Sequence, residues 1–337
     1  MAGMRVLVTG ASGFVGAHAT VAMAALGHEP HLLVRNPEKV VRVLAALAPP
    51  QEWPIHQADI RDAPAVRRAL ERCDAVLHAA ADMGVTGHAT DLRGTNVTGL
   101  ANVLGQAAEL GLDPIVHVST VAVFVPPTGP MITVDSPLAS PRNGYGRSKV
   151  EGDRYARDLR GVTIVYPGGV AGPHQPTLDG LNEGLRAGLR SGWPIVPGGV
   201  SVLDVRDLAV ALARCFVPGQ GARRYVLGGN FLTWAEIAFL ARRLTGRKGR
   251  TLRMPGTLLR ALAAALDGVK GLGLRVAYPL TRDAADFMLT LVPTHDTTAL
   301  KELGVTLRPA DDTVSDTLRW LVAEGHLKPR EIGRLAP

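Results

Sequence analysis

Short apolar runs alternate with amphipathic segments over the first half of the chain. The apolar runs are rich in β-branched residues, as buried strands are, and comprise Met4–Thr9, His31–Arg35, Ile55–Asp59, Ala75–Ala80, Pro114–Thr120 and Val162–Tyr166. The segments between them have helical periodicity and comprise Phe14–Leu26, Glu38–Ala48, Ala63–Arg72, Leu92–Leu110 and Tyr145–Leu159. This alternation predicts an α/β fold with a doubly wound parallel sheet, whose ligands bind at the carboxyl ends of the strands.

The pattern changes after Pro167, where glycine and proline interrupt the chain more often. Helices are expected at Asp179–Ser191, Asp204–Phe216, Trp234–Thr245, Gly256–Ala265, Arg282–Leu291 and Thr313–Glu324, and a strand at Arg223–Leu227. We therefore expect a dinucleotide-binding Rossmann domain over residues 1–166. Residues 167–337 are expected to form a smaller, mainly helical substrate lobe, with a part near residues 200–230 returning to the sheet.

Three glycines follow the first predicted strand and lead into the first predicted helix. Gly10 can turn tightly at positive φ, Gly13 lets the backbone approach a pyrophosphate, and Gly16 allows close packing of helix on strand. Phosphates bound there would meet the N-terminus of the helix, where free N–H groups favour anions. The alternative is a purely structural turn. The pattern predicts a dinucleotide site with contacts from Gly10, Ser12, Gly13, Phe14 and Val15.

The end of the second predicted strand selects the cofactor. An acidic residue at this place binds the ribose hydroxyls of NAD, whereas an arginine suits the 2′-phosphate of NADP. Here the strand ends at Arg35, with Lys39 nearby, which favours NADP over NAD. The alternative is that Arg35 is a solvated strand end.

Composition and charge exclude several other classes of function. The formal net charge is +7, but the 37 lysines and arginines are scattered and do not alternate with aromatic residues, so nucleic acid is not an expected partner. Cys73 and Cys215 lie far apart, outside any metal-ligand spacing, and predict buried thiols in a reducing compartment. No apolar stretch is long enough to span a membrane. We expect a cytoplasmic protein without a metal site.

Tyr145 and Lys149 carry the candidate chemistry. Their spacing of four residues places both side chains on one face of a helix. A tyrosine with an ordinary pKa near ~10 is a poor acid–base catalyst, and an adjacent ammonium together with a positive nicotinamide is expected to lower that pKa. Upstream, Ser119 and Thr120 end a predicted strand with a hydroxyl that can polarise a substrate carbonyl. Surface helices also place Tyr and Lys four residues apart, which is the alternative.

In order and spacing, the glycine turn, the hydroxyl strand end and the Tyr145–Lys149 pair resemble the extended short-chain dehydrogenase/reductases. This resemblance covers nearly the whole chain and implies a catalytic trio of Thr120, Tyr145 and Lys149. The segments ADIRD, DAVLHAAA and GTNVTGLANVL, the last with Asn96, resemble further family segments. They imply cofactor contacts from Asp59, Ile60, Ala79, Ala80 and Ala81, besides Tyr145 and Lys149.

Two later segments resemble the family with changes. The stretch from Tyr166 to Val170 is similar to the arginine–proline segment beside the nicotinamide, with Tyr166 in the arginine's place, and it implies cofactor contacts from Pro167 and Val170. The segment DVRDLAVAL also resembles a family segment. We interpret its acids, Asp204 and Asp207, as structural residues that start a helix.

Differences from the family pattern reduce the range of substrates that we expect. Val121 and Ala122 stand where sugar-nucleotide dehydratases carry an acid pair, and Pro197–Leu203 lacks the arginine that binds a substrate diphosphate. The predicted pocket rim is apolar and consists of Met83, Phe124 and Val125, with His174 opposite. An apolar pocket favours a hydrophobic substrate, as in the dihydroflavonol-4-reductase and 3β-hydroxysteroid dehydrogenase branches. The alternatives are that Phe124 and its neighbours belong to the ordinary hydrophobic core and that His174 is a loop residue without a role in the site.

The sequence thus predicts an NADP-dependent oxidoreductase that interconverts a hydrophobic ketone or aldehyde and its alcohol. The first alternative is a sugar or sugar-nucleotide epimerase that retains its cofactor, and the second is a non-catalytic NAD(P)-binding regulator. The resemblance also implies a homodimer that pairs Leu92–Leu110 and Tyr145–Leu159 across a two-fold axis. Ala101, Leu104, Ala108 and Val150 are the expected contacts, unless they face the sheet.

Overall fold

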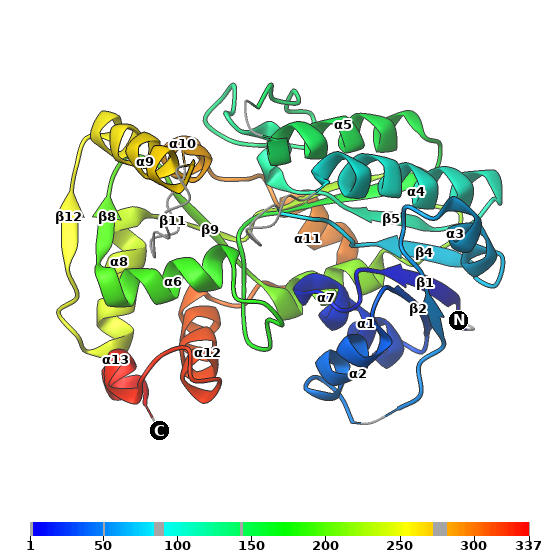
Figure 1. Cartoon of the computed structure of the whole chain (residues 1–337), viewed down its shortest axis with the longest axis horizontal. Helices are drawn as coiled ribbons and strands as arrows, with labels where there is room; N and C mark the ends of the chain where they lie inside the picture. Colours follow the sequence, from blue (N-terminus) through cyan, green and yellow to red (C-terminus); the bar gives the residue numbers. More distant parts are fainter. Residues whose placement is uncertain (1–2, 50, 84–90, 142–143, 272–281, 337) are drawn as a thin grey trace.

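The computed structural model describes residues 3–336 except 50, 84–90, 142–143 and 272–281. Its centre is a seven-stranded sheet in the order β10-β6-β5-β4-β1-β2-β3, with every strand parallel to its neighbours (Figure 1). The strands are β1 (Arg5–Thr9), β2 (Glu29–Val34), β3 (Ile55–Gln57), β4 (Ala75–His78), β5 (Ile115–Val118), β6 (Val162–Pro167) and β10 (Arg224–Leu227). The six strands expected before residue 167 are confirmed, with ends that differ by one or two residues.

Helices cover both faces of this sheet (Figure 1). One face carries α1 (Phe14–Ala25), α2 (Pro37–Ala45), α7 (Val205–Arg214) and α11 (Thr297–Leu303). The other carries α3 (Ala63–Leu70), α4 (Leu100–Glu109) and α5 (Gly144–Asp158). The doubly wound α/β class is therefore confirmed.

The central strands are apolar on both sides because both faces are covered. In β1, Val8 packs toward α1 while its neighbour Leu7 packs toward α4, and both are fully buried. Val76 and Leu77 alternate in the same way in β4. Such strands appear in the sequence as continuous apolar runs, which is why they were predictable.

The predicted helix Leu92–Leu110 has a different start. Its first turns are a π-helix, η1 (Gly94–Gly99), which continues directly into α4. The side chain of Asn96 on η1 accepts a hydrogen bond from the backbone N–H of Asp82 and donates to the Asp82 carbonyl, both at 2.8 Å. The wider turn is a local rearrangement around these contacts, which helical periodicity does not reveal.

The chain after Pro167 contains the expected helices and further elements that the pattern did not predict. The helices are α6 (Gly180–Ser191), α8 (Trp234–Thr245), α9 (Gly256–Gly271), α10 (Arg282–Thr290), α12 (Ala310–Ala323) and α13 (Pro329–Ile332), followed by the 3₁₀ turn η3 (Gly333–Leu335). Another 3₁₀ turn, η2 (Val121–Phe124), lies earlier in the chain, shortly after β5. One small sheet has the order β11-β9-β7 and another pairs β12 with β8. Their strands are β7 (Val170–Ala171), β8 (Trp193–Ile195), β9 (Gly199–Asp204), β11 (Asn230–Thr233) and β12 (Thr251–Arg253).

These five strands are two to six residues long, so too short for a period of two to stand out. β10 joins β6 at the edge of the main sheet, whereas β9 lies outside that sheet. The division of the chain into two domains at Tyr166 stays a prediction. None of the described helices is long and apolar enough to cross a lipid bilayer.

Asp204 connects a small sheet to the main sheet. It is the last residue of β9 and directly precedes α7, which packs on the main sheet. It is the N-cap of that helix and accepts the backbone N–H of Arg206 at 2.9 Å. Its buried carboxylate also pairs with the Arg206 guanidinium at 2.7 Å, and the same guanidinium reaches the more exposed Asp316 at 2.8 Å. Asp207 accepts the backbone N–H of Arg308 at 2.7 Å.

We predict that Asp204→Ala lowers the free energy of unfolding by about 2–3 kcal/mol, because it removes a cap and a buried charge partner together. Asp316→Ala is the matched control, since it removes the partly exposed partner of the same arginine and should cost less than about 1 kcal/mol. Urea denaturation followed by circular dichroism measures both. Equal effects of the two substitutions would show that Asp204 is not a structural cap.

Candidate active site

The turn between β1 and α1 requires glycine because the backbone comes too close to its neighbours for a side chain. Gly10 has a φ of 80°, and a Cβ there would lie 2.6 Å from the backbone carbonyl carbon of Ala79. A Cβ on Gly16 would lie 2.2 Å from the carbonyl oxygen of Gly10. The turn therefore holds the start of α1 directly against the ends of β1 and β4.

This turn fits the pyrophosphate of a dinucleotide. Gly13 is the N-cap of α1 and, in the part of the chain that the structure describes, no side chain bonds to the N–H groups of that cap. The first turn of α1 also has no acidic residue. Unpaired N–H groups and the helix dipole favour a diphosphate at this end. Ser12, Phe14 and Val15 are partly exposed beside it.

The other residues predicted to contact the cofactor follow the carboxyl ends of neighbouring strands. Arg35 follows β2 and is exposed, Asp59 and Ile60 follow β3, and Ala79–Ala81 follow β4. Because β4, β1, β2 and β3 are adjacent and parallel, all these positions share one edge of the sheet with the glycine turn.

Asp59 and Ile60 have different surroundings on this edge. The Asp59 carboxylate binds Arg61 at 2.8 Å, and this hydrogen bond is the main reason why its pKa is lowered. Arg35 contributes a smaller Coulomb interaction to the same carboxylate. Ile60 is buried, and its side chain lies where a Cβ on Gly99 would otherwise fit. The side chain of Ile60 thus packs against η1.

The strand end after β5 presents two hydroxyls with different roles. Ser119 is buried and donates to the carboxylate of Asp153 at 2.8 Å. Thr120 is partly exposed, and its oxygen accepts the backbone N–H of Ala122 at 3.2 Å. A hydroxyl that accepts one hydrogen bond keeps its own hydrogen for another acceptor, such as a carbonyl. The geometry therefore favours Thr120 over Ser119 for contact with a substrate.

Tyr145 and Lys149 lie on the first two turns of α5, with Lys149 buried against the sheet. Burial lowers the pKa of Lys149 to about 8, while Asp153 raises it. Burial raises the pKa of Tyr145 to about 12, and the negative charge of Asp179 adds to this shift. The protein by itself thus shifts the tyrosine pKa upward, opposite to the expected direction.

Sequence reasoning missed Asp153, Arg157 and Asp179. Asp153 and Arg157 continue the four-residue spacing of Tyr145 and Lys149 along α5, and this spacing was the signal that could have identified them. Asp179 precedes α6 and accepts a hydrogen bond from Gln175 at 2.6 Å. Nothing in the sequence pattern places it near Tyr145, because the two residues belong to different elements.

The predicted substrate residues differ in their exposure to solvent. Met83 is 44% exposed, whereas Phe124 is 1% exposed and packs on Tyr166 with ring centroids 4.9 Å apart. Val125 is also buried. The alternative interpretation of Phe124 as ordinary core therefore describes its position. His174 is exposed with a φ of 61°, and it interacts electrostatically with His18 of α1.

Asn96, Pro167 and Val170, which the family resemblance also singled out, lie near the carboxyl ends of the strands. Asn96, besides its two bonds to Asp82, donates to the hydroxyl of Ser148 on α5 at 3.0 Å. It therefore joins η1, the segment after β4 and α5. Pro167 ends β6, and Val170 in β7 is partly exposed and pairs with Leu203.

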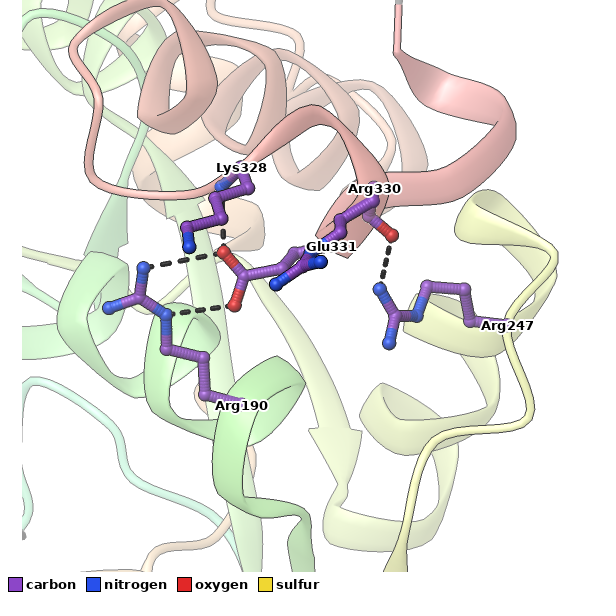
Figure 2. Close-up of a pocket in the computed structure, with 5 residues that line it drawn as sticks. All are labelled: Arg190, Arg247, Lys328, Arg330 and Glu331. Atoms are coloured by element: carbon purple, nitrogen blue, oxygen red, sulfur yellow. Dashed lines mark hydrogen bonds and ion pairs between the residues drawn. The ribbon is translucent and has the colours of Figure 1, made fainter.

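A cavity of about 650 Å³ lies elsewhere, among residues of α6, α13 and the segment after α8. Figure 2 shows Arg190 facing Glu331, at 2.9 Å, and Arg247 facing the backbone oxygen of Arg330. None of the predicted site residues lines this cavity. It is separate from the sheet edge that carries the candidate chemistry.

Comparisons with known proteins agree with this geometry. The model of the NAD dependent epimerase/dehydratase family matches residues 6–227. Sterol demethylase protein B of Methylococcus capsulatus is 30% identical over 277 residues, which cover 78% of this chain and 81% of that protein. A 4-hydroxy-2-methyl-3-oxo-4-farnesyl-3,4-dihydroquinoline-1-oxide ketoreductase of Stigmatella aurantiaca is 26% identical over 94% of this chain and 96% of that protein.

Among solved structures, UDP-glucose 4-epimerase of Bifidobacterium longum in complex with NAD+ and UDP has a TM-score of 0.71 and 17% identity. This match covers 95% of this chain and 99% of that one. The fold is therefore that of an enzyme class that includes both reductases and epimerases. The family model and the relatives confirm the resemblance predicted from the sequence. This chain belongs to the NAD-dependent epimerase/dehydratase family of extended short-chain dehydrogenase/reductases and is an enzyme that uses a nicotinamide cofactor.

Proposed function

We propose that this enzyme is an NADP-dependent oxidoreductase that interconverts a hydrophobic ketone or aldehyde and its alcohol. One observation carries the proposal: the hydroxyl of Ser119 is bound to Asp153, whereas that of Thr120 is partly exposed at the same sheet edge as the glycine turn. A hydroxyl that can donate a hydrogen bond to a carbonyl thus follows β5, and the tyrosine and the lysine lie on α5.

Each member of the trio has a separate role in this proposal. Thr120 donates a hydrogen bond to the substrate carbonyl, and Tyr145 delivers the proton during reduction. A phenol with a pKa of about 12 stays protonated at neutral pH, which is the form that a proton donor needs. Lys149 stabilises the phenolate that remains and binds the nicotinamide ribose. Gly10, Gly13 and the N-terminus of α1 would hold the dinucleotide, which would supply the hydride.

A hydrophobic substrate is supported by the departures from the sugar-nucleotide pattern. The stretch Pro197–Leu203 contains no arginine for a diphosphate, and its last five residues belong to the buried strand β9. Val121 and Ala122 also leave no acid pair for water elimination. The names of two relatives refer to a sterol and to a farnesylated dihydroquinoline oxide, and both compounds have large hydrocarbon portions. Exposed Met83 offers an apolar contact at this edge.

A sugar or sugar-nucleotide epimerase is the second candidate, because matched proteins include UDP-glucose 4-epimerases. The two functions differ in stoichiometry. A reductase consumes one NADPH for each carbonyl reduced, whereas an epimerase returns its cofactor unchanged. Incubation with a panel of apolar carbonyls, followed at the absorbance of NADPH, detects a reductase. Incubation with UDP-glucose, followed by chromatography of the sugar nucleotides, detects an epimerase. A protein that binds NADPH and turns over neither class of substrate would contradict both candidates.

We predict that Tyr145→Phe lowers turnover by about 10²–10⁴-fold, because only the proton-donating hydroxyl is lost, while NADPH affinity stays nearly constant. Steady-state kinetics and a separate cofactor titration measure the two effects. Tyr155→Phe is the matched control, since it deletes a hydroxyl from the same helix away from Lys149, and it should keep full activity. Parent-like turnover of Tyr145→Phe would overturn the mechanism.

The remaining members of the trio are tested by the same assays. Lys149→Ala should lose both turnover and cofactor affinity, because this lysine acts on the phenol and on the ribose. Thr120→Ser should retain most activity and Thr120→Ala should not. If Ser119→Ala were inactive with a normal melting temperature while Thr120→Ala stayed active, the assignment of the two hydroxyls would be reversed.

We propose NADP rather than NAD because Arg35 is exposed at the end of β2, where a 2′-phosphate would lie. The nearby Asp59 is held by Arg61 rather than by Arg35. We predict that the unmodified enzyme binds NADPH more tightly than NADH and that Arg35→Asp reverses this preference. Titration calorimetry with both cofactors measures it, with Arg42→Asp, an exposed residue of α2, as the control for the change in charge. Equal affinities in the unmodified enzyme would contradict the proposal.

We also propose a cytoplasmic homodimer. Burial raises the pKa of both cysteine thiols, Cys73 and Cys215, to about 12, as suits inert thiols in a reducing compartment. Of the expected dimer contacts, Leu104 and Val150 are buried in the core of their own chain, because they face the sheet. Only Ala101 and Ala108 of α4 remain partly exposed.

We predict a dimer in sedimentation velocity at micromolar concentration, with an isologous contact through the outer faces of α4 and α5. Ala108→Arg should shift the protein toward monomer, because a long charged side chain would oppose its symmetry mate. A monomeric parent protein, or a dimer that Ala108→Arg leaves intact, would rule out this interface.

A further inference from the structure

Four polar residues repeat at a spacing of four along α5: Tyr145, Lys149, Asp153 and Arg157. This spacing places them on one face of the helix. The middle two are buried against β5 and β6, whereas Arg157 reaches the surface with 22% of its side chain exposed. The catalytic helix therefore presents a row of charges to the core, where an unpaired charge is costly.

Asp153 is the centre of this row. Its side chain is fully buried, and each carboxylate oxygen has partners. One oxygen accepts the hydroxyl of Ser119 at 2.8 Å. The other pairs with the Arg157 guanidinium at 2.7 Å and accepts the hydroxyl of Tyr166 at 3.2 Å. Asp153 thus ties α5 to the strand end that carries Thr120.

Arg157 is fixed in this position by several further contacts. Its guanidinium donates to the Tyr166 hydroxyl from two nitrogens, at 3.0 and 3.1 Å. Its central carbon also lies over the rings of Phe124 and Tyr166, 5.7 and 5.6 Å from their centroids. The family resemblance implies an arginine at the position of Tyr166, and in this structure the guanidinium of Arg157 lies at the Tyr166 hydroxyl. Burial raises the pKa of the Asp153 carboxyl, and the Arg157 guanidinium opposes this shift by stabilising the ionised form.

Lys149 faces titratable groups from three elements. His78 on β4 and His117 on β5 both interact with it electrostatically, and burial lowers the pKa of each imidazole well below its usual value, so both are neutral. Tyr145 is protonated at neutral pH. Asp153 is the group that raises the pKa of Lys149 against the effect of burial. Among these groups, Asp153 is therefore the one that favours the charged form of the lysine.

We propose that Asp153, kept ionised by Arg157, is a positioning residue that holds Lys149 protonated and, through Ser119, holds the strand end that presents Thr120. This role rests on the function proposed above for Lys149. Neither Asp153 nor Arg157 contacts the substrate in this arrangement. Their effect on turnover passes through the lysine, and a change in the charge of Lys149 is therefore the property to measure.

The direct test is an NMR titration of the lysine side chains, which needs no substrate. The chain has six lysines, Lys39, Lys149, Lys248, Lys270, Lys301 and Lys328, so selective labelling with [¹³C]lysine yields a small set of signals. Lys149→Arg identifies the signal of interest. We expect its midpoint near pH 8 in the parent protein and about one unit lower in Asp153→Asn, since an opposite charge is lost. Asp153→Glu should keep the parent midpoint.

Arg157→Gln provides a second variant at the more exposed end of the row, should Asp153→Asn fail to fold. Without the guanidinium the Asp153 carboxyl becomes easier to protonate, so the Lys149 midpoint should again fall. Arg154→Gln, an exposed arginine of the same helix, is the matched control and should leave the midpoint unchanged. An unchanged Lys149 midpoint in both Asp153→Asn and Arg157→Gln would overturn the proposal.

The pH dependence of kcat/KM for carbonyl reduction links this charge to activity. Lys149 is cationic below its pKa, so activity should be present at lower pH and lost as the pH rises through about 8. In Asp153→Asn this loss should begin about one pH unit lower. If the NMR midpoint shifts but the parent enzyme reduces no carbonyl, the network stands and the proposed function fails. If the parent reduces carbonyls and the pH profile does not move in Asp153→Asn, the positioning role fails alone.

Discussion

The close approach of the turn after β1 to the end of β4 is the constraint on which the rest of the site depends. A Cβ at Gly10 would overlap the backbone of Ala79, and one at Gly16 would overlap the turn itself. With glycine at both places, α1 starts directly at the sheet edge and its free N–H groups face the space above β1. α7 then packs along α1, so the same turn also positions the segment that Asp204 caps.

The second determinant is the burial of charged groups beneath α5. A lysine taken out of water loses solvation, and a carboxylate nearby restores the stability of its charged form. Asp153 meets the same difficulty and is compensated by Arg157, Ser119 and Tyr166. The stabilising interactions therefore extend from Lys149 in the core through Asp153 to Arg157, whose side chain is still partly exposed to solvent. The buried network also links α5 to β5 and β6, so that the same contacts support both the fold and the site.

Much of the architecture could be read from local patterns. The central strands are covered on both faces, which makes them continuous apolar runs, and α2, α3 and α4 each have one apolar stripe. α1 differs, because it is buried between the sheet and α7. The strands after Pro167 were missed because each is short and pairs with a remote segment, as β9 does with β7 and β11. The π-helical turns before α4 were also missed, and Asn96 within them bonds to Asp82, which is 14 residues away in the sequence.

The sequence by itself determined the order of strands and helices as far as Pro167, the glycine turn and the four-residue spacing of Tyr145 and Lys149 on one helix, since these features depend on neighbours within a few residues. Only the tertiary structure decided which strand-end hydroxyl is exposed, because Ser119 finds its partner on α5 and Thr120 does not. It also decided that Phe124 lies in the core, against Tyr166 of β6. The direction of the Tyr145 pKa shift depends on burial and on Asp179, from an element that follows α5 in the chain. Burial and electrostatic interactions act through space, so a local pattern along the chain cannot specify them.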